Sequence, residues 1–255
     1  AAFVPPPPVP SHVFLDELAR ATDPAAPTSL VPLDLSPVLG VPGPATTPSI
    51  LAAYARLRRG ESLDTRFHTG IEYWLALEGA GRSSWDGGAV DWRAGDLFFL
   101  PGGRGVTHCA EAADALLYVM TDQPLATFLG LGATERPAFE PVHYLRERIE
   151  EHQRATFEAT GDSGVIHFGA ADRFVYSSIL PTWKWLKPGE RQASHRHAAV
   201  AVQIFLAGDD CWSEVDGGRI DWRRGAVSVS PAGSLHSHHN GGRGPGEYLV
   251  APDFA

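Results

Sequence analysis

Two ten-residue stretches of this 255-residue chain, 130 positions apart, have nearly the same sequence. Residues 86–95 read Asp-Gly-Gly-Ala-Val-Asp-Trp-Arg-Ala-Gly, residues 216–225 read Asp-Gly-Gly-Arg-Ile-Asp-Trp-Arg-Arg-Gly, and seven of the ten positions are identical. The flanking pattern repeats too, since Gly60, His68, Gly79 and Pro101 correspond to Gly189, His197, Gly208 and Pro231. Self-similarity over such a distance predicts two copies of one domain, at roughly residues 45–125 and 172–255.

Each copy consists of short apolar runs separated by Gly and Asp-Gly turns. The clearest runs are Tyr73–Leu77, Asp96–Leu100, Val200–Leu206 and Ala226–Ser230. This pattern is typical of antiparallel barrels and jelly rolls, so the predicted fold class is all-β. Ser49–Arg59 has helical propensity, but it aligns with Thr182–Pro188, whose Trp-Lys-Trp alternation indicates a strand. We therefore expect a strand in both places.

Two segments lie outside the repeats. Residues 1–44 are rich in proline and form a predicted N-terminal arm with a short helix near His12–Arg20, which we expect to cover a partner subunit. Residues 126–171 form a predicted linker. Within it, His143–Thr156 is charged and has helical periodicity, so we expect a short linker helix there.

The composition bounds the partners and the compartment. The net charge of −9 argues against a nucleic-acid backbone or an anionic membrane as the main partner. No apolar stretch approaches the roughly 20 residues of a membrane helix, and the first residues lack the charged start and apolar run of a signal peptide. Two cysteines, Cys109 and Cys211, form no disulfide framework. The expected compartment is the cytoplasm.

Histidines cluster in the second copy. His195 and His197 are two positions apart, so on a strand both side chains point to one face, which in a small barrel can be the interior. His236 follows the Pro231–Gly233 turn on a later predicted strand. Three neutral imidazoles suit one divalent Fe, Ni, Cu, Mn or Zn ion and leave positions for water or substrate. These three residues are therefore the predicted metal ligands.

Two further histidines follow closely. His238 has the side-chain parity of His236, so it is either an alternative ligand or a residue that orients a ligand or the substrate. His239 has the opposite parity, and we expect it at the surface.

The spacings in the second copy resemble the two sequence motifs of cupins, and the resemblance covers both repeats. The residues that carry it are Gly189, His195, His197, Gly208, Gly225, Pro231, Gly233, His236 and Asn240. Most cupins have a glutamate ligand in the slot of Ala201. A three-histidine chain with two cupins resembles the gentisate 1,2-dioxygenase group, which uses Fe(II) and O2 to cleave aromatic rings. His195-Arg-His197, His236-Ser-His238 and Asp122-Gln-Pro124-Leu125 agree with that group.

The resemblance implies a duplicated cupin fold, metal ligands at His195, His197 and His236, a small-molecule substrate and O2, and a homo-oligomer. Three departures from the sequence pattern of the gentisate dioxygenase group affect which substrate is expected. Ala199 stands where the group has a glutamine, Gln203 where it has an arginine, and Leu235 where it has a tryptophan. Losing the arginine removes a bidentate partner for a carboxylate.

We therefore predict that Gln203 and His238 contact the substrate, and that gentisate itself is a poor candidate. The wall of the site is less defined. Trp183 and Trp185 share a face, so both or neither line the interior.

The first copy has lost part of the motif. Arg66 aligns with the first histidine, where a fixed positive charge would repel a metal ion, and Glu72 could form an ion pair with it. His108 follows Pro101 by seven residues, whereas His236 follows Pro231 by five. We expect one metal per chain, in the second copy. A residual site at His68, Glu72 and His108 remains an alternative.

Three functions fit these features. The first is a metal-dependent dioxygenase, with Fe(II), that acts on a small aromatic or hydroxy-carboxylic acid. The second is a non-redox isomerase, lyase or decarboxylase that uses Zn, Mn or Ni as a Lewis acid. The third is a metal-containing protein that binds a small molecule without turnover. Dependence on oxygen separates the first two, and consumption of the ligand separates both from the third.

Overall fold

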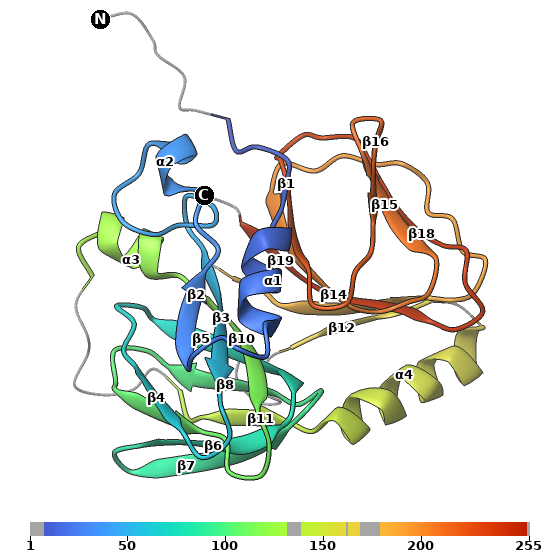
Figure 1. Cartoon of the computed structure of the whole chain (residues 1–255). Coiled ribbons are helices and arrows are strands. Elements are labelled where there is room, and N and C mark those ends of the chain that lie inside the picture. Colours follow the sequence, from blue (N-terminus) through green and yellow to red (C-terminus); the bar gives the residue numbers. More distant parts are fainter. Residues whose placement is uncertain (1–7, 132–138, 162, 169–178, 254–255) are drawn as a thin grey trace, which may run out of the picture.

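The computed structural model describes residues 8–131, 139–161, 163–168 and 179–253. The chain forms two β-barrels that lie side by side, with a long helix beside them (Figure 1). Each barrel combines a six-stranded sheet with a smaller sheet. The all-β, duplicated architecture predicted from the repeat is confirmed.

The first barrel contains residues of the first repeat, with one strand added from the arm and one from the linker. Its six-stranded sheet has the order β11 (Val142–Tyr144), β8 (Leu97–Pro101), β5 (Ile71–Glu78), β10 (Ala115–Thr121), β3 (Leu51–Leu57) and β2 (Ser29–Pro32). Its four-stranded sheet has the order β4 (Ser62–Thr65), β9 (Val106–Cys109), β6 (Ala80–Trp85) and β7 (Gly88–Arg93).

The second barrel repeats this arrangement. Its six-stranded sheet has the order β1 (His12–Val13), β17 (Val227–Ser230), β14 (Val200–Ala207), β19 (Gly246–Asp253), β13 (Thr182–Leu186) and β12 (Val165–His167). Its three-stranded sheet has the order β16 (Gly218–Asp221), β15 (Cys211–Val215) and β18 (His236–Asn240). The central order β8-β5-β10-β3 thus recurs as β17-β14-β19-β13, and the β5–β10 and β14–β19 pairs each contain one register shift.

The strand expected in place of a helix at Ser49–Arg59 is confirmed as β3. All seven of its residues are buried, and it pairs with β10 on one side and β2 on the other. Burial between two strands outweighs the helical propensity of this alanine-rich segment.

The N-terminal arm packs on its own chain. Strand β1 pairs with β17 of the second barrel, helix α1 (Leu15–Thr22) follows, and β2 pairs with β3 of the first barrel before the short helix α2 (Ser36–Leu39). The short helix was therefore predicted correctly, and the described part of the arm packs on the two barrels of its own chain. Contact of the arm with a partner subunit stays a prediction. Assembly into a homo-oligomer stays a prediction.

The linker, like the arm, contributes one strand to each barrel. After helix α3 (Gln123–Phe128), β11 pairs with β8 of the first barrel, and after helix α4 (Arg146–Thr160), β12 pairs with β13 of the second. The predicted linker helix is confirmed as α4, although Val142–Tyr144 belongs to a strand and the helix starts later. It ends at Gly161, whose φ of 68° is the left-handed conformation that glycine adopts easily.

The two six-stranded sheets face each other across a shared hydrophobic core. Tyr54, Tyr73 and Trp183 are fully buried members of this core. The hydroxyl of Tyr54 donates to the carbonyl oxygen of Gly225 (2.6 Å), and that of Tyr73 donates to the carbonyl oxygen of Ile179 (2.8 Å). These bonds cross from one barrel to the other and fix their relative position.

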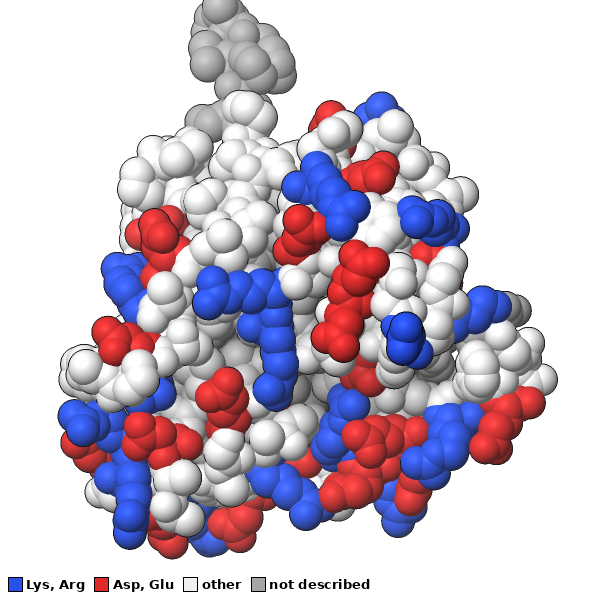
Figure 2. All heavy atoms as spheres, turned by 45° about the vertical axis from the view of Figure 1, so that its right-hand side comes forward, with Lys and Arg blue, Asp and Glu red and all other residues white. Residues whose placement is uncertain are grey.

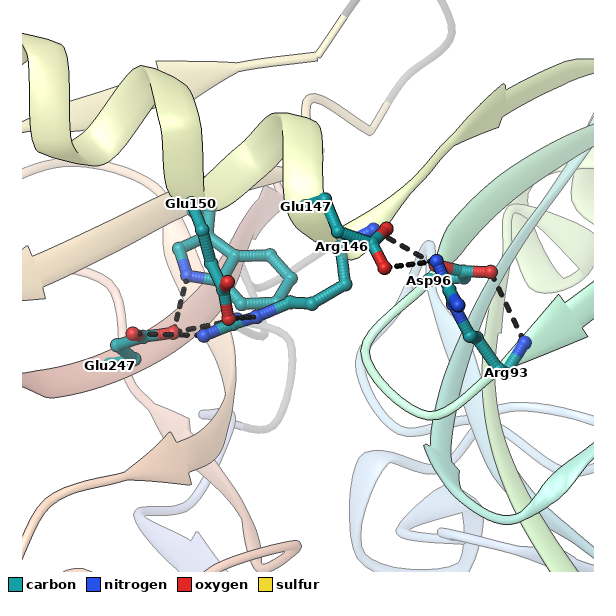
Figure 3. A network of polar contacts seen from close by, with 7 residues as sticks. Arg93, Asp96, Arg146, Glu147, Glu150 and Glu247 are labelled. Atoms are coloured by element: carbon teal, nitrogen blue, oxygen red, sulfur yellow. Dashed lines mark hydrogen bonds and ion pairs between the residues drawn. The ribbon is translucent and has the colours of Figure 1, made fainter.

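A polar network at the start of α4 also joins the barrels (Figure 3). The backbone N–H of Arg146 donates to Asp96 of the first barrel (2.9 Å). Its guanidinium donates two hydrogen bonds to Glu247 of the second barrel (2.9 and 3.2 Å) and lies 5.1 Å from the centroid of the Trp183 ring. A planar guanidinium suits this combination of a bidentate carboxylate and an aromatic face.

The surface carries charges of both signs. On the face seen in Figure 2, Lys and Arg side chains are interspersed with Asp and Glu side chains and form no continuous basic surface. This fits the net charge of −9. None of the described helices combines the length and apolar composition needed to cross a membrane.

Candidate metal centre

The structure brings the three predicted ligands together. His195, His197 and His236 each offer a ring nitrogen, and these nitrogens lie within 4.8 Å of one another. His236 is on β18, but His195 and His197 lie on the loop before β14 and not on a regular strand as predicted. Backbone hydrogen bonds between His195 and His236 (2.9 and 3.0 Å) form an isolated bridge that fixes this loop beside β18.

The same nitrogen of each ring is held by a backbone carbonyl two residues away. Nδ1 of His195 lies 3.2 Å from the carbonyl oxygen of Ala193. Nδ1 of His197 lies 2.8 Å from that of Ala199, and Nδ1 of His236 lies 3.0 Å from that of Ser234. A carbonyl oxygen only accepts, so each Nδ1 carries the hydrogen and each Nε2 keeps its lone pair. Three Nε2 donors held this way have the tautomer that a metal ion needs.

Burial supports the neutral form of the deepest ligand. His236 is 3% exposed, whereas His195 and His197 have access to solvent. Burial lowers the pKa of His236, and the neighbouring imidazoles lower it further. The cluster contains no carboxylate, because Ala201 occupies the slot of the usual cupin glutamate.

His238 lies next to this cluster and is anchored from behind. Its Nδ1 is 2.8 Å from Oγ of Ser213, which accepts a hydrogen bond from Nε1 of Trp222 (2.8 Å). The rings of His236 and His238 are 5.9 Å apart, and burial lowers the pKa of His238 well below its usual value. Sequence reasoning identified His238 but missed Ser213 and Trp222, although Trp222 lies within the repeated ten-residue motif.

The prediction for His239 was half right. It faces away from the metal cluster, but it is only 7% exposed and not at the surface. Its Nε2 is 2.9 Å from Oγ of Ser237, and its ring stacks on Trp212 at 5.1 Å. Because Arg219 also packs over the Trp212 ring, at 4.2 Å from its centroid, this face of β18 is covered.

Gln203 faces the interior of the second barrel. Its side chain is 1% exposed, and its Nε2 donates to Oγ of Ser230 (3.1 Å). The Oε1 atom has no hydrogen-bond partner among the described residues. A buried acceptor without a partner is costly, so this atom is suited to a ligand that donates a hydrogen bond.

The tryptophans of β13 do not line the interior. Trp183 belongs to the core between the barrels, and Trp185 shares its face. Lys184 lies between them and pairs directly with Tyr248 of β19, whose ring is 4.8 Å from that of His238. Lys184 therefore points inward, and sequence reasoning did not single it out.

The strand register corrects the alignment of the first repeat. In the second barrel His195 lies opposite His236, and in the first barrel Thr65 lies opposite Val106. The residue equivalent to His195 is therefore Thr65 and not Arg66, whose side chain is exposed. Two positions further along, Phe67 is buried inside the first barrel, where the second barrel has His197.

The expected ion pair between Arg66 and Glu72 is also absent from the described contacts. Glu72 is fully buried; its Oε2 accepts a hydrogen bond from Nε1 of Trp74 (2.9 Å), and its Oε1 has no partner among the described residues. Burial raises the pKa of Glu72 to about 8.

His108 is not a displaced ligand. Its Nδ1 is 2.8 Å from Oγ of Ser83 and its Nε2 is 3.0 Å from Oγ1 of Thr65, so both ring nitrogens are engaged. Burial lowers its pKa to about 3. Ser83 accepts a hydrogen bond from Trp92 (2.9 Å), which makes His108 the counterpart of His238.

The alternative of a residual site at His68, Glu72 and His108 is therefore not supported, and His68 is exposed. Among the described residues, His195, His197 and His236 form the only group of three or more His, Cys, Asp or Glu side chains that lie close enough to share a metal. A cavity of about 780 Å³ lies between the barrels, beside Arg146, but none of these three residues lines it. The candidate site is therefore identified by the converging ring nitrogens of the three histidines and not by this cavity.

Comparisons with known proteins agree with this architecture. Salicylate 1,2-dioxygenase from Pseudaminobacter salicylatoxidans superposes with a TM-score of 0.79 over 96% of this chain and 84% of that one, at 17% identity. A cupin 2 conserved barrel domain protein from Leptotrichia buccalis superposes with a TM-score of 0.62 over 95% and 96%, at 14% identity. The chain has a duplicated cupin fold.

The sequence matches are short. Gentisate 1,2-dioxygenase from Ralstonia sp. is 36% identical over 69 residues, which is 27% of this chain and 19% of that enzyme. 1-Hydroxy-2-naphthoate 1,2-dioxygenase from Nocardioides sp. (strain KP7) is 36% identical over 66 residues, which is 26% of this chain and 17% of that enzyme. The match thus covers about a fifth of the curated relatives. No family model matches the chain.

Proposed function

We propose that this bicupin is a metal-dependent dioxygenase that acts on a small aromatic or hydroxy-carboxylic acid, with Fe(II) held by His195, His197 and His236. One observation carries the proposal. Each of the three rings is fixed by a hydrogen bond from Nδ1 to a backbone carbonyl, and their free nitrogens converge. Bound Fe(II) would supply one-electron chemistry with O2 and open positions for an oxygen-bearing substrate.

The charge of the site selects the class of substrate. Three neutral imidazoles do not offset the charge of a divalent ion, and no carboxylate belongs to the cluster. The site therefore favours an anion that brings two oxygen atoms, such as a hydroxy-carboxylate. Relatives and structural neighbours named for gentisate, salicylate and 1-hydroxy-2-naphthoate act on acids of this kind.

Two side chains of the second barrel would contact the substrate. The free Oε1 of Gln203 can accept a hydrogen bond from a substrate hydroxyl. His238 is locked in position by Ser213 and stays neutral because it is buried, so its ring can exchange a hydrogen bond with an oxygen of the substrate. Gentisate remains a poor candidate, because Gln203 replaces the arginine of the gentisate group.

The test is anaerobic purification, elemental analysis, and O2 uptake against a panel of hydroxylated aromatic acids. One iron per chain with O2 consumed in proportion to one of the acids is the expected result. Turnover without O2 in the presence of zinc would instead identify a non-redox isomerase, lyase or decarboxylase. An acid that binds without being consumed would identify a binding protein.

A further inference from the structure

One cationic side chain lies inside the second barrel, beside the candidate metal centre. Lys184 occupies the middle of β13 and pairs with Tyr248. Its Nζ is 6.0 Å from the centroid of the Tyr248 ring, and that ring is 4.8 Å from the ring of His238. The ring of His238 is in turn 5.9 Å from the ring of His236.

Lys184 has no acidic partner within the described part of the chain. It forms no ion pair there, and burial lowers its pKa. The nearest acidic residues along β19 are turned away: Glu247 binds Arg146, and Asp253 accepts a hydrogen bond from Thr47. Since a half-buried ammonium without a counter-charge destabilises a fold, its presence here calls for a ligand.

The first barrel has an uncharged residue at the equivalent position. Ala55 lies opposite Leu117 there, as Lys184 lies opposite Tyr248 in the second barrel. The neighbouring interior position is Trp74 in the first barrel and Gln203 in the second, paired with Phe98 and Ser228 respectively. The lysine therefore occurs only in the barrel that has the histidine cluster.

We propose that Lys184 binds the carboxylate of the acidic substrate and supplies the positive charge that Gln203 cannot. This rests on the proposed function only in taking an organic acid as the ligand of the second barrel. A lysine is a compact charge on a flexible stem, so it can meet a carboxylate without the fixed geometry that an arginine imposes. The enzyme should therefore discriminate strongly between an acid and its neutral amide.

The experiment compares Lys184→Met with Lys187→Met, which removes the chain's only other lysine. Lys187 donates to the carbonyl oxygen of Gly161 outside the barrel, so it is a matched control. Titration calorimetry on the metal-loaded, anaerobic protein measures the Kd of salicylate and of salicylamide. Elemental analysis confirms equal metal content, and thermal unfolding confirms the fold.

We expect Lys184→Met to raise the Kd of salicylate by about 30-fold or more, which is typical when one member of a buried charge pair is removed. The Kd of salicylamide should change by less than about 3-fold, and Lys187→Met should bind both ligands with the Kd values of the wild type. Lys184→Met should also unfold at the same or a higher temperature, because an unpaired buried charge is removed. Lys184→Arg should restore part of the preference for the acid.

Equal losses for acid and amide, or no loss for the acid, would refute the role of Lys184. Failure of the wild type to prefer salicylate over salicylamide would refute it as well. The proposed dioxygenase activity is judged separately by O2 uptake. A protein that binds the acid through Lys184 but consumes no O2 upholds this inference and removes the other.

Discussion

The two barrels have the same scaffold and different interiors. In both, a tryptophan donates to a serine that holds a buried histidine: Trp92, Ser83 and His108 in the first barrel correspond to Trp222, Ser213 and His238 in the second. The serine–histidine distance is 2.8 Å in each. This shared triplet is therefore a structural element of the fold, and its presence alone does not mark a metal site.

The difference lies in the residues that face inward around the triplet. Thr65, Phe67 and Val106 in the first barrel are replaced by His195, His197 and His236 in the second. Each interior contains a buried acceptor without a partner among the described residues, Oε1 of Glu72 in the first barrel and Oε1 of Gln203 in the second. Only the second barrel adds a cluster of three imidazoles and a lysine that forms no ion pair with the described residues, and the burial of such a charge is costly unless a ligand is bound.

The largest expected effect comes from removing the buried ligand. His236→Ala should lower metal affinity by more than about 100-fold and abolish O2 uptake, because even the loss of a group that only orients a ligand costs about 10- to 100-fold. Elemental analysis after dialysis measures this. The control is His68→Ala in the first barrel, which should keep a full complement of metal. Equal metal loss in both variants would contradict the assignment to the second barrel.

The second prediction concerns the network that joins the barrels. Arg146→Met leaves the carboxylate of Glu247 buried without its partner, so the free energy of unfolding should fall by about 3 kcal/mol. Urea denaturation measures it. Arg148→Met, on the exposed face of the same helix, should change stability by less than about 0.5 kcal/mol. Similar values for the two variants would show that Arg146 does not couple the barrels.

The shared triplet can be tested in both copies. Ser83→Ala and Ser213→Ala each leave Nδ1 of a buried histidine and a tryptophan N–H without the serine partner, so each should cost about 1–3 kcal/mol of stability. Only Ser213→Ala should also reduce O2 uptake, by about 10- to 100-fold, because His238 loses its orientation. Denaturation curves and uptake rates separate the two effects. Reduced uptake in Ser83→Ala at unchanged stability would contradict the division of roles.

The last prediction concerns the pH dependence of stability, which depends on the buried carboxyl group of the first barrel. The pKa of Glu72 is raised from 4.5 to about 8, so its stabilising contribution is complete below pH 4.5 and is lost as the pH rises towards 8. Glu72→Gln should remove a slope of up to about 1.4 kcal/mol per pH unit in that window. Urea denaturation at several pH values measures the difference from the wild type. Glu78→Gln, exposed on the same strand, should leave the slope unchanged.

The sequence predicted two copies of one β-domain and the three clustered histidines, because turn glycines and the Pro231 motif recur at fixed spacing. It placed the wrong residue opposite His195. The second copy has one extra residue between Arg191 and His195, relative to Ser62 and Thr65, and one fewer before β14. Because the extra and the missing residue cancel, the flanking glycines keep the same spacing in both copies and the sequence does not reveal the shift. Only the strand pairing identifies Thr65 as the equivalent of His195.

Lys184 escaped the sequence analysis for a different reason. Strand β13 is buried on both faces, with four of its five residues buried, so alternation does not tell inside from outside. The sequence left open whether the two tryptophans line the interior; Trp183 belongs to the core between the barrels, and Trp185 shares its face. The packing of the second barrel against the first determines which face of β13 points into the barrel. The sequence of this strand alone does not contain that information.

The flanking strands have a consequence for dissection of the molecule. The edges of each six-stranded sheet are closed by one strand from the arm and one from the linker, so neither repeat contains its own edge strands. Residues 172–255 expressed alone would leave β17 and β13 as open edges that can pair with other chains. We therefore expect that the repeat with the candidate metal centre does not fold as a separate soluble fragment. A fragment that keeps both β1 and β12 also contains the first repeat, because that repeat lies between them in the sequence.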